Sequence, residues 1–212
     1  MFSSIRLSPP ILFAIAYLLG SIPFGLILAK LFGGTDVRKA GSGNIGATNV
    51  ARVVGPLAGI LTLALDAAKG YFAVWLAARW LHAETSVLFI AGFCVLLGHC
   101  FPIWLRFRGG KGVATAAGVF LALCPWAMFA ALSLFIVVVI LSRFVSLGSL
   151  SAAASIPLLV YLLWTPHFAP RTVSFGSLAI AGLVIFQHRA NLGRLARGEE
   201  PKFSFGKKKS EE

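Results

Sequence analysis

A run of glycines and small polar residues, KAGSGNIGATN at positions 39–49, has the composition of an anion-binding loop. Its three glycines, Gly43 among them, let the backbone turn its N–H groups inward, where they can donate to an anion. Four side chains of the run add hydrogen-bonding groups, namely Ser42, Asn44, Thr48 and Asn49. Arg52 adds a cation shortly afterwards. The run therefore predicts an anion site, with a plain flexible loop as the alternative.

A second glycine-containing segment, FRGGKG at positions 107–112, is built like a phosphate-binding loop. Gly109 and Gly110 open the backbone, and Lys111 supplies a point charge. The spacing is not that of a Walker A motif, and no acidic partner for magnesium stands nearby, so nucleotide hydrolysis is not expected. For Arg106 and Arg108, anchoring at the membrane surface is an equal alternative.

A third segment, HRANLGRLARGEE at positions 188–200, follows the last apolar run of the chain. His188, Arg189 and Asn191 stand at the end of that run, where the negative end of a helix dipole favours cations. These three residues could bind an anion, or they could simply cap the helix.

Polar residues also occur inside the apolar runs. Asp66 and Lys69 stand three residues apart, on one face of a helix, and are best explained as a structural ion pair. His99 lies at the end of an apolar run, where a lone histidine is more often structural than catalytic. We therefore expect these residues to support the fold.

The elements that position the three segments are predicted to be membrane-spanning helices. Of the 212 residues, 58% are hydrophobic and only 12% are charged, unlike the composition of a soluble protein. Apolar runs of membrane-spanning length lie at 9–32, 54–81, 85–105, 113–141, 147–165 and 173–187. They leave no room for a separate soluble domain. We expect one all-α domain over 1–212, with a charged cytoplasmic tail over about 199–212.

The basic residues indicate the topology. They cluster near 38–52, 106–111, 143 and 189–209, and the positive-inside rule places these segments in the cytoplasm. To bring Lys111 and Arg143 to one side, the run at 113–141 must turn, most simply at Pro125, and form two short helices. The expected fold is a polytopic integral membrane protein of about seven transmembrane helices, two of them short, with the N-terminus outside and the C-terminus cytoplasmic.

Acidic residues are scarce beside these cations. On the face predicted to be cytoplasmic they are Asp36 and the glutamates of the tail, so a metal-dependent or carboxylate-based mechanism has few candidates. We expect no metal and no cofactor. A site made of donors and cations should bind phosphate groups and stabilise developing negative charge.

Taken together, AGSGNIGATNVAR, GHCFPIWLRFRGGKG and HRANLGRLARGEE resemble the three motif regions of the bacterial acyl-phosphate-dependent glycerol-3-phosphate acyltransferases, the PlsY family. The resemblance covers nearly the full chain. It implies an enzyme that transfers a fatty acyl group from acyl phosphate to glycerol 3-phosphate and releases lysophosphatidic acid and inorganic phosphate. It also implies a bacterial inner-membrane protein whose active site faces the cytoplasm.

The resemblance carries site residues with it. It implies phosphate-binding elements at Ser42, Gly43, Asn44, Thr48, Asn49, Gly109, Gly110 and Lys111. It implies that the glycerol phosphate is held by Arg52, His188 and Asn191. A further serine of the family lies within RFVSLGS, where Ser146 is our choice and Ser149 the alternative. Among all of these, the residues that we expect to be catalytic are Ser42, Asn44, Lys111 and His188.

No carboxylate is well placed to take the proton of the acceptor hydroxyl. We favour a phosphate oxygen of a substrate as the base, with His188 as the alternative from the protein. The expected partners are acyl phosphate, glycerol 3-phosphate and membrane lipids, with an enzyme that forms acyl phosphate acting upstream. Nucleic acid is not expected.

A phosphate or organophosphate transporter is the alternative from another class of protein, because transporters also build anion sites beside broken helices. Such transporters usually consist of two related halves with a site near the middle of the membrane. This sequence has no visible internal repeat, and its polar segments cluster at one interface. The sequence therefore favours the enzyme.

Overall fold

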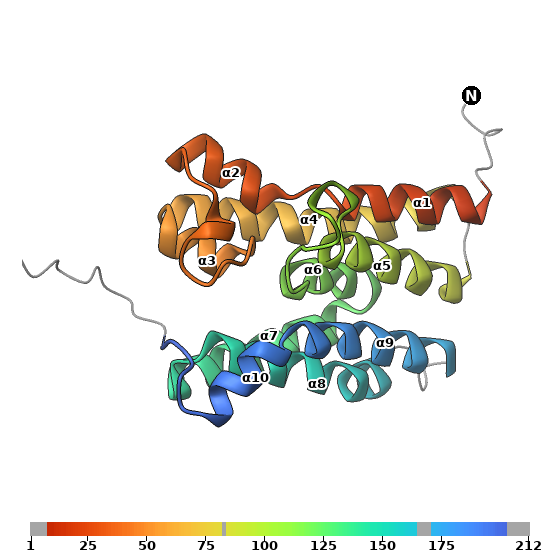
Figure 1. Ribbon diagram of the computed structural model, residues 1–212. Coiled ribbons are helices and arrows are strands. Elements are labelled where there is room, and N and C mark those ends of the chain that lie inside the picture. Colours follow the sequence, from red (N-terminus) through yellow and green to blue (C-terminus); the bar gives the residue numbers. More distant parts are fainter. Residues whose placement is uncertain (1–7, 82–83, 165–170, 203–212) are drawn as a thin grey trace, which may run out of the picture.

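The computed structural model describes residues 8–81, 84–164 and 171–202, and every regular element within these ranges is a helix, as predicted (Figure 1). Along the described chain the elements are α1 (Pro9–Gly20), α2 (Phe24–Gly33), η1 (Val37–Lys39), α3 (Ala47–Val53), α4 (Pro56–Leu81), α5 (Thr85–Cys100), η2 (Ile103–Leu105), α6 (Val113–Leu123), α7 (Pro125–Ser142), α8 (Val145–Leu163), α9 (Arg171–Gln187) and α10 (Arg189–Ala196).

Helices of membrane-spanning length dominate the described chain. Five segments are long and apolar enough to cross a bilayer, namely Pro9–Gly33, Pro56–Arg79, Thr85–Leu105, Pro125–Ser142 and Val145–Leu163. Helices α9 and α10, which are bent by 57° at their junction, make a sixth if they count as one span. The remaining apolar helix is α6, with 11 residues. These seven apolar segments confirm the predicted polytopic, all-helical membrane fold.

The first apolar run is not one continuous helix, in contrast to the span predicted over 9–32. It breaks between α1 and α2, where Pro23 lacks a backbone N–H and disfavours the helical conformation of the residue before it. The break exposes the carbonyl of Ile22, which accepts a hydrogen bond from Lys69 Nζ at 3.0 Å. Lys69 Nζ also lies 2.9 Å from Asp66 Oδ1, which confirms the predicted ion pair.

The turn predicted at Pro125 is present, because α6 ends at Leu123 and α7 begins at Pro125. The prediction that both helices are short is wrong for α7, whose 18 residues can cross a bilayer. Proline favours the first turn of a helix, and this proline lies nearer the start of the apolar run than its end. The run is therefore divided unequally, and only α6 is short.

Two groups of helices form the molecule. Figure 1 shows α1, α2, α4, α5 and α6 above, and α7, α8 and α9 below. One large apolar core joins the groups and includes Leu12, Leu96, Val119, Val160 and Ile180. Within the upper group α4 and α6 cross so closely that a Cβ atom on Gly118 would collide with the carbonyl of Ala67. This contact locks the short α6 against a full-length helix.

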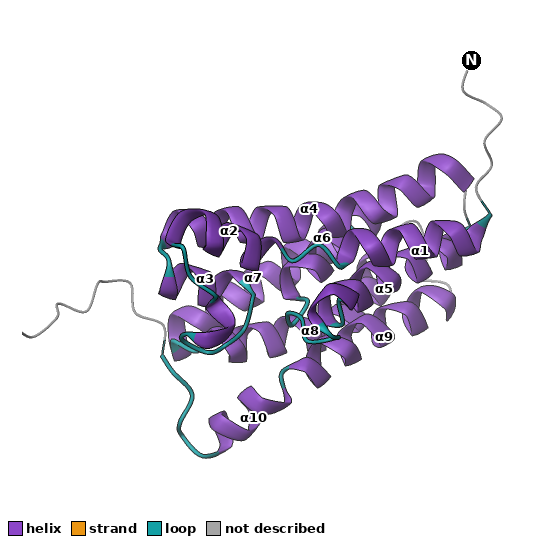
Figure 2. Ribbon diagram, turned by 45° about the horizontal axis from the view of Figure 1, so that its top comes forward, coloured by secondary structure: helices purple, strands orange, loops and turns teal. Residues whose placement is uncertain are grey.

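A second, smaller core lies between α2, α3 and α4 and includes Leu26, Val37, Ile45 and Val50. Val37 and Ile45 belong to the chain that joins α2 to α3, which Figure 2 shows as a loop at one end of the bundle, and they are buried in one cluster with Leu26 of α2 and Val50 of α3. Apolar burial of this kind fixes the path of a loop that has little regular structure of its own. The first glycine-rich segment is therefore held against the bundle.

Candidate active site

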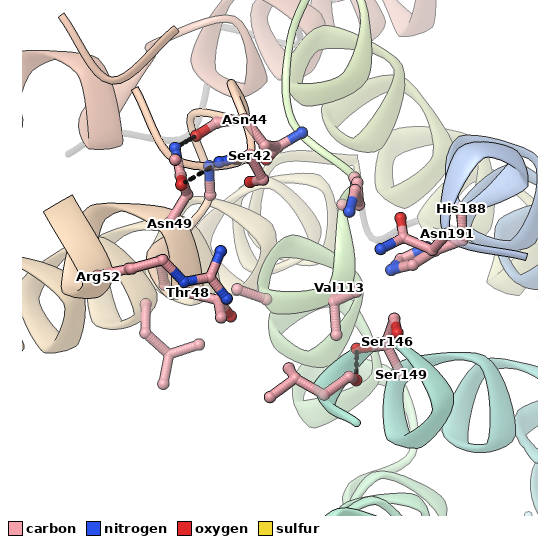
Figure 3. Close-up of a pocket in the computed structure, with 18 of the residues that line it drawn as sticks. Ser42, Asn44, Thr48, Asn49, Arg52, Val113, Ser146, Ser149, His188 and Asn191 are labelled. Atoms are coloured by element: carbon pink, nitrogen blue, oxygen red, sulfur yellow. Dashed lines mark hydrogen bonds between the residues drawn. The ribbon is translucent and has the colours of Figure 1, made fainter. Parts of the chain in front are cut away.

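A cavity of about 460 Å³ brings the three polar segments together. Of the twelve residues predicted for the site, nine line it, namely Ser42, Asn44, Thr48, Asn49, Arg52, Lys111, Ser146, His188 and Asn191. In Figure 3 the residues of the first segment and α3 lie on one side and Ser146, Ser149, His188 and Asn191 on the other, with Val113 between them. Residues far apart in sequence thus face one space.

Gly43, Gly109 and Gly110 do not line the cavity. The N–H of Gly109 donates to the carbonyl of Cys100, and that of Gly110 donates to the carbonyl of His99, both at 3.0 Å. The ring of His99 also lies so close to Gly110 that it would collide with a Cβ atom there. Gly109 and Gly110 let the loop pack tightly against the end of α5, and this packing brings Lys111 to the cavity. The phosphate-binding role expected for all three glycines stays a prediction.

Asn49 organises the first segment. Its side chain is buried, its Oδ1 accepts the N–H of Ser42 at 2.8 Å, and its Nδ2 donates to the carbonyls of three loop residues, Val37, Ala40 and Asn44, at 3.0, 3.1 and 2.8 Å. Figure 3 shows the contact with Ser42. One amide therefore replaces the backbone hydrogen bonds that this irregular loop lacks. Ser42 is held at the cavity by its backbone, which leaves its hydroxyl for a ligand.

The start of α3 carries the next group of cavity residues. Asn44 Oδ1 accepts the N–H of Gly46 at 2.8 Å, just before the helix begins. Thr48 and Arg52 are one helical turn apart on α3 and both line the cavity (Figure 3). Side chains four residues apart share a helix face, so one face of α3 presents both Thr48 and Arg52 to the cavity.

Lys111 enters from the loop before α6. Burial lowers its pKa to about 8, against the opposing attraction of the Glu200 carboxylate, and the nearby cations Arg194 and Arg52 lower it further. Burial and nearby cations destabilise the protonated form of Lys111, and a bound anion would stabilise that form. The site therefore favours an anion, and anion binding should raise the pKa of Lys111 again.

This pKa predicts an alkaline limit to activity. In the free protein the Lys111 ammonium loses its proton as the pH rises through about 8, so kcat/KM for an anionic substrate should fall above that pH. The measurement is kcat/KM between pH 6 and 10. Lys111→Arg keeps a cation that does not titrate in this range, so the fall should disappear in this variant even if its activity is lower. If kcat/KM of Lys111→Arg falls above pH 8 as it does in the wild type, the titrating group is not Lys111. We call this fall the alkaline limb of the pH profile.

On the opposite wall, His188 lies at the bend between α9 and α10. Its Nδ1 is 2.8 Å from the carbonyl oxygen of Val184. Since a carbonyl can only accept, Nδ1 carries the proton of the neutral ring and Nε2 is left as an acceptor. Ser146 and Ser149 both line the cavity, but the Ser149 hydroxyl donates to the carbonyl of Val145 at 2.9 Å. Ser146 makes no such bond to its own helix, which favours Ser146 as the serine of the site.

Sequence reasoning missed Glu200, which lines the same cavity. Its carboxylate accepts from Asn191 Nδ2 at 2.6 Å and from Arg194 Nε at 2.7 Å. Burial alone would raise the pKa of Glu200, but the nearby Ser146 hydroxyl and the bonds from Asn191 and Arg194 outweigh burial and lower it. Glu200 is therefore ionised at neutral pH. The sequence offered one indication of this role, because Glu200 is an acidic residue in a segment that is otherwise basic.

Asp66 and His99 also line the cavity, although the sequence indicated only a structural role. Asp66 Oδ1 is 3.6 Å from His99 Nδ1, and both side chains are buried. Among the described residues no cluster of histidine, cysteine, aspartate and glutamate is arranged to hold a metal ion. The cavity is thus lined by three cations, Arg52, Lys111 and Arg194, and by two carboxylates, of which Asp66 is paired with Lys69 and Glu200 with Arg194.

The cavity also has an apolar wall, formed by Leu63 of α4, Val113 of α6 and Phe135 of α7. The three cations Arg52, Lys111 and Arg194 line the same space. A compound with a phosphate group and an alkyl chain would match both surfaces. Fold and cavity together define a multi-helix integral membrane protein with an internal cavity that combines cations with an apolar wall.

Comparison with known proteins identifies the class more closely. The family model for glycerol-3-phosphate acyltransferase matches residues 10–198, and the chain belongs to this family of membrane acyltransferases. Similar proteins include the glycerol-3-phosphate acyltransferases of Trichlorobacter lovleyi, 50% identical over 89% of this chain and 94% of the relative, and of Desulforamulus reducens, 44% identical over 92% and 94%. The resemblance found in the three motif segments is confirmed.

Solved structures support the same assignment. A crystal structure of PlsY, an integral membrane glycerol 3-phosphate acyltransferase, in its glycerol 3-phosphate form is 39% identical, with a TM-score of 0.86 over 92% of this chain and 96% of that chain. The lysophosphatidic acid form of PlsY is 38% identical, with a TM-score of 0.84 over 92% and 95%. The described helices thus have the arrangement of an experimentally determined membrane acyltransferase.

Proposed function

We propose that the protein transfers a fatty acyl group from acyl phosphate to glycerol 3-phosphate and forms lysophosphatidic acid and inorganic phosphate. The observation that carries this proposal is the single cavity in which Lys111, Arg52 and an apolar wall meet. Both substrates carry phosphate, and one carries a long alkyl chain. The glycerol 3-phosphate and lysophosphatidic acid forms of the similar PlsY structures support the acceptor and the product.

The chemical step needs charge stabilisation more than acid catalysis. A hydroxyl oxygen of glycerol 3-phosphate attacks the acyl carbonyl carbon, the bond from that carbon to the phosphate oxygen breaks, and phosphate leaves with the electron pair. Because phosphate is a good leaving group, a fixed cation that neutralises it is the most useful contribution of the protein. We assign this role to Lys111, with the hydroxyl of Ser42 and the amide of Asn44 as donors on the same side of the cavity.

We assign the acceptor substrate to Arg52 from the α3 side of the cavity and to Ser146, His188 and Asn191 from the opposite side. Thr48 and Asn49 complete the phosphate side, Thr48 as a cavity donor and Asn49 through the loop that it organises. The proton of the attacking hydroxyl passes to a phosphate oxygen of a substrate. His188 Nε2 accepts a hydrogen bond from the glycerol moiety and orients it, since Nδ1 is committed to Val184.

His188→Gln separates the two candidate bases. Glutamine keeps a hydrogen-bond acceptor but does not titrate. If a substrate phosphate takes the proton, only binding is impaired, so KM for glycerol 3-phosphate should rise about tenfold while kcat changes only a few-fold. Steady-state kinetics at saturating acyl phosphate measure both constants. A fall in kcat of about 10²–10⁴-fold, with unchanged binding of glycerol 3-phosphate, would make His188 the general base instead.

We also propose the setting in which this reaction takes place. The protein is a single domain of the bacterial inner membrane, with its N-terminus outside, its C-terminus inside and its cavity open to the cytoplasm, supported by the distribution of basic residues. An enzyme that forms acyl phosphate acts upstream. A cysteine that replaces Ser8 should react with a membrane-impermeant maleimide from the outer side; labelling only from the cytoplasmic side would reverse the orientation.

The proposed reaction is tested with purified protein, acyl phosphate and glycerol 3-phosphate, with EDTA present. Phosphate release and formation of the acylated product are expected under these conditions. Acylation only with acyl-CoA or acyl carrier protein would replace the proposed donor. Uptake of glycerol 3-phosphate into proteoliposomes without any acylation would favour the transporter over the enzyme.

A further inference from the structure

The chain after α10 folds back and places a carboxylate in an anion site. The N–H of Glu199 donates to the carbonyl of Arg194 at 2.8 Å, and the N–H of Gly198 donates to the carbonyl of Leu195 at 3.1 Å. This turn directs Glu200 into the cavity, where only 7% of its side chain is exposed. A buried carboxylate beside phosphate-binding cations would weaken substrate binding unless it had a compensating effect.

The contacts of Glu200 identify that effect. Its two carboxylate oxygens are used by different partners, Oε1 by Asn191 Nδ2 and Oε2 by Arg194 Nε, which lie three residues apart on α10. An amide that donates through Nδ2 to a fixed carboxylate cannot flip, and a guanidinium held through Nε keeps its orientation. Glu200 therefore fixes two side chains of the cavity wall.

Glu200 is also a counter-charge. The cations of the cavity come from three elements, Arg52 from α3, Lys111 from the loop before α6 and Arg194 from α10, and His188 lies at the bend before α10. Removal of the carboxylate would leave Lys111 facing other cations, which oppose its protonation. Asp66 is the other carboxylate that lines the cavity, and it is paired with Lys69.

We propose that Glu200 is a positioning residue of the acyl-transfer reaction, which holds Asn191 and Arg194 toward the acceptor substrate and balances the charge of Lys111. This inference rests on the proposed function. Glu200 acts through its neighbours, and the substrate does not need to displace it. The alternative is a carboxylate that competes with substrate phosphate for the same donors, and the two roles predict opposite changes in affinity.

Glu200→Gln distinguishes these roles, because the amide keeps the shape of the side chain but must turn a donor toward either Asn191 or Arg194. Glu199→Gln is the matched control. Glu199 is the preceding residue, is 57% exposed and pairs only with the exposed Arg197 among the described residues. Both variants remove one negative charge from the same turn. We expect KM for glycerol 3-phosphate to rise about tenfold in Glu200→Gln and to stay within twofold of the wild type in Glu199→Gln.

The pH profile gives a second readout, which a purely structural role would not move. The alkaline limb assigned to Lys111 should shift to lower pH in Glu200→Gln, because the carboxylate that favours the ammonium is lost, and should not shift in Glu199→Gln. An unchanged limb, or an unchanged or lower KM in Glu200→Gln, would overturn the proposal. A lower KM would show that the carboxylate competes with substrate.

Two further measurements keep the test independent of folding and of the reaction. Glu200→Asp retains the charge but withdraws the carboxylate by one methylene, so a smaller rise in KM is expected; wild-type KM in this variant would contradict the proposal. Thermal stabilisation by inorganic phosphate, followed in the wild type and both glutamine variants, reports binding without turnover. Weaker stabilisation of Glu200→Gln alone supports the proposal even if the acyl donor has been misassigned, and equal stabilisation of all three proteins overturns it.

Discussion

Lys111→Ala should lower kcat/KM by about 10²–10³-fold without unfolding the protein. The loss of one fixed charge that stabilises a developing oxyanion costs about 3–4 kcal/mol in the transition state. Lys111 is the cavity cation that enters from the glycine loop, and its backbone lies outside the helices that form the core. Phosphate release from acyl phosphate, measured at pH 7 where the wild-type ammonium is intact, quantifies the effect.

Arg108→Ala is the matched control for this prediction. Arg108 is a cation of the same loop, three residues earlier, but it is exposed and does not line the cavity. Its removal should leave kcat/KM within a few-fold of the wild type. If a well-folded Lys111→Ala protein were as active as Arg108→Ala, Lys111 would be an interfacial anchor and the proposed role in phosphate neutralisation would fail.

Asn49→Asp should inactivate the enzyme by a different route, through collapse of the first loop. The two N–H bonds of Asn49 Nδ2 serve three carbonyl oxygens within hydrogen-bond distance, and aspartate would place a carboxylate oxygen against all three. Each unsatisfied buried group costs about 1–3 kcal/mol, so the loop should lose its conformation and activity should fall by at least about 10²-fold. Activity and the thermal unfolding midpoint of the detergent-solubilised protein are the measurements.

Asn44→Asp is the isosteric comparison. Asn44 uses its carbonyl oxygen, which accepts the N–H of Gly46, and a carboxylate preserves that acceptor at the start of a helix. Its unfolding midpoint should therefore stay close to that of the wild type, whereas that of Asn49→Asp should fall. Equal midpoints for the two variants would show that the amide of Asn49 does not hold the loop.

Much of the fold follows from the sequence because apolar runs of membrane length have few alternatives in a bilayer. The turn at Pro125 was predictable from the placement of basic residues. The break before Pro23 was not predicted, because the apolar run continues on both sides of it and its overall length suits a single span, although Gly20, Ser21 and Pro23 mark the position. The carbonyl freed there is satisfied by Lys69, a residue 47 positions away in sequence. A pairing of that range leaves no local signal.

The candidate site was predictable in its composition but not in its internal contacts. Three polar segments of unusual chemistry identified eight residues that share one cavity, and the family resemblance added Ser146 as the ninth. The role of each residue could not be predicted, because it depends on which side-chain atoms already form hydrogen bonds within the protein. Asn49 and Asn44 are the same residue type five positions apart, yet one organises a loop through its NH₂ group and the other closes the turn before α3 through its oxygen. Glu200 was missed for the same reason, since only tertiary structure brings it to Asn191.

The length of α6 has a consequence for the membrane as a whole. A helix of 11 residues extends about 16 Å, roughly half the thickness of the hydrocarbon layer. The cavity lies at one end of α6, beside Lys111 and Val113, and the turn at Cys124 lies at the other. With the proposed topology the site then opens to one leaflet, and with the proposed reaction every new lysolipid is delivered to that leaflet alone. Growth of the opposite leaflet would then depend on lipid transport across the bilayer by other proteins.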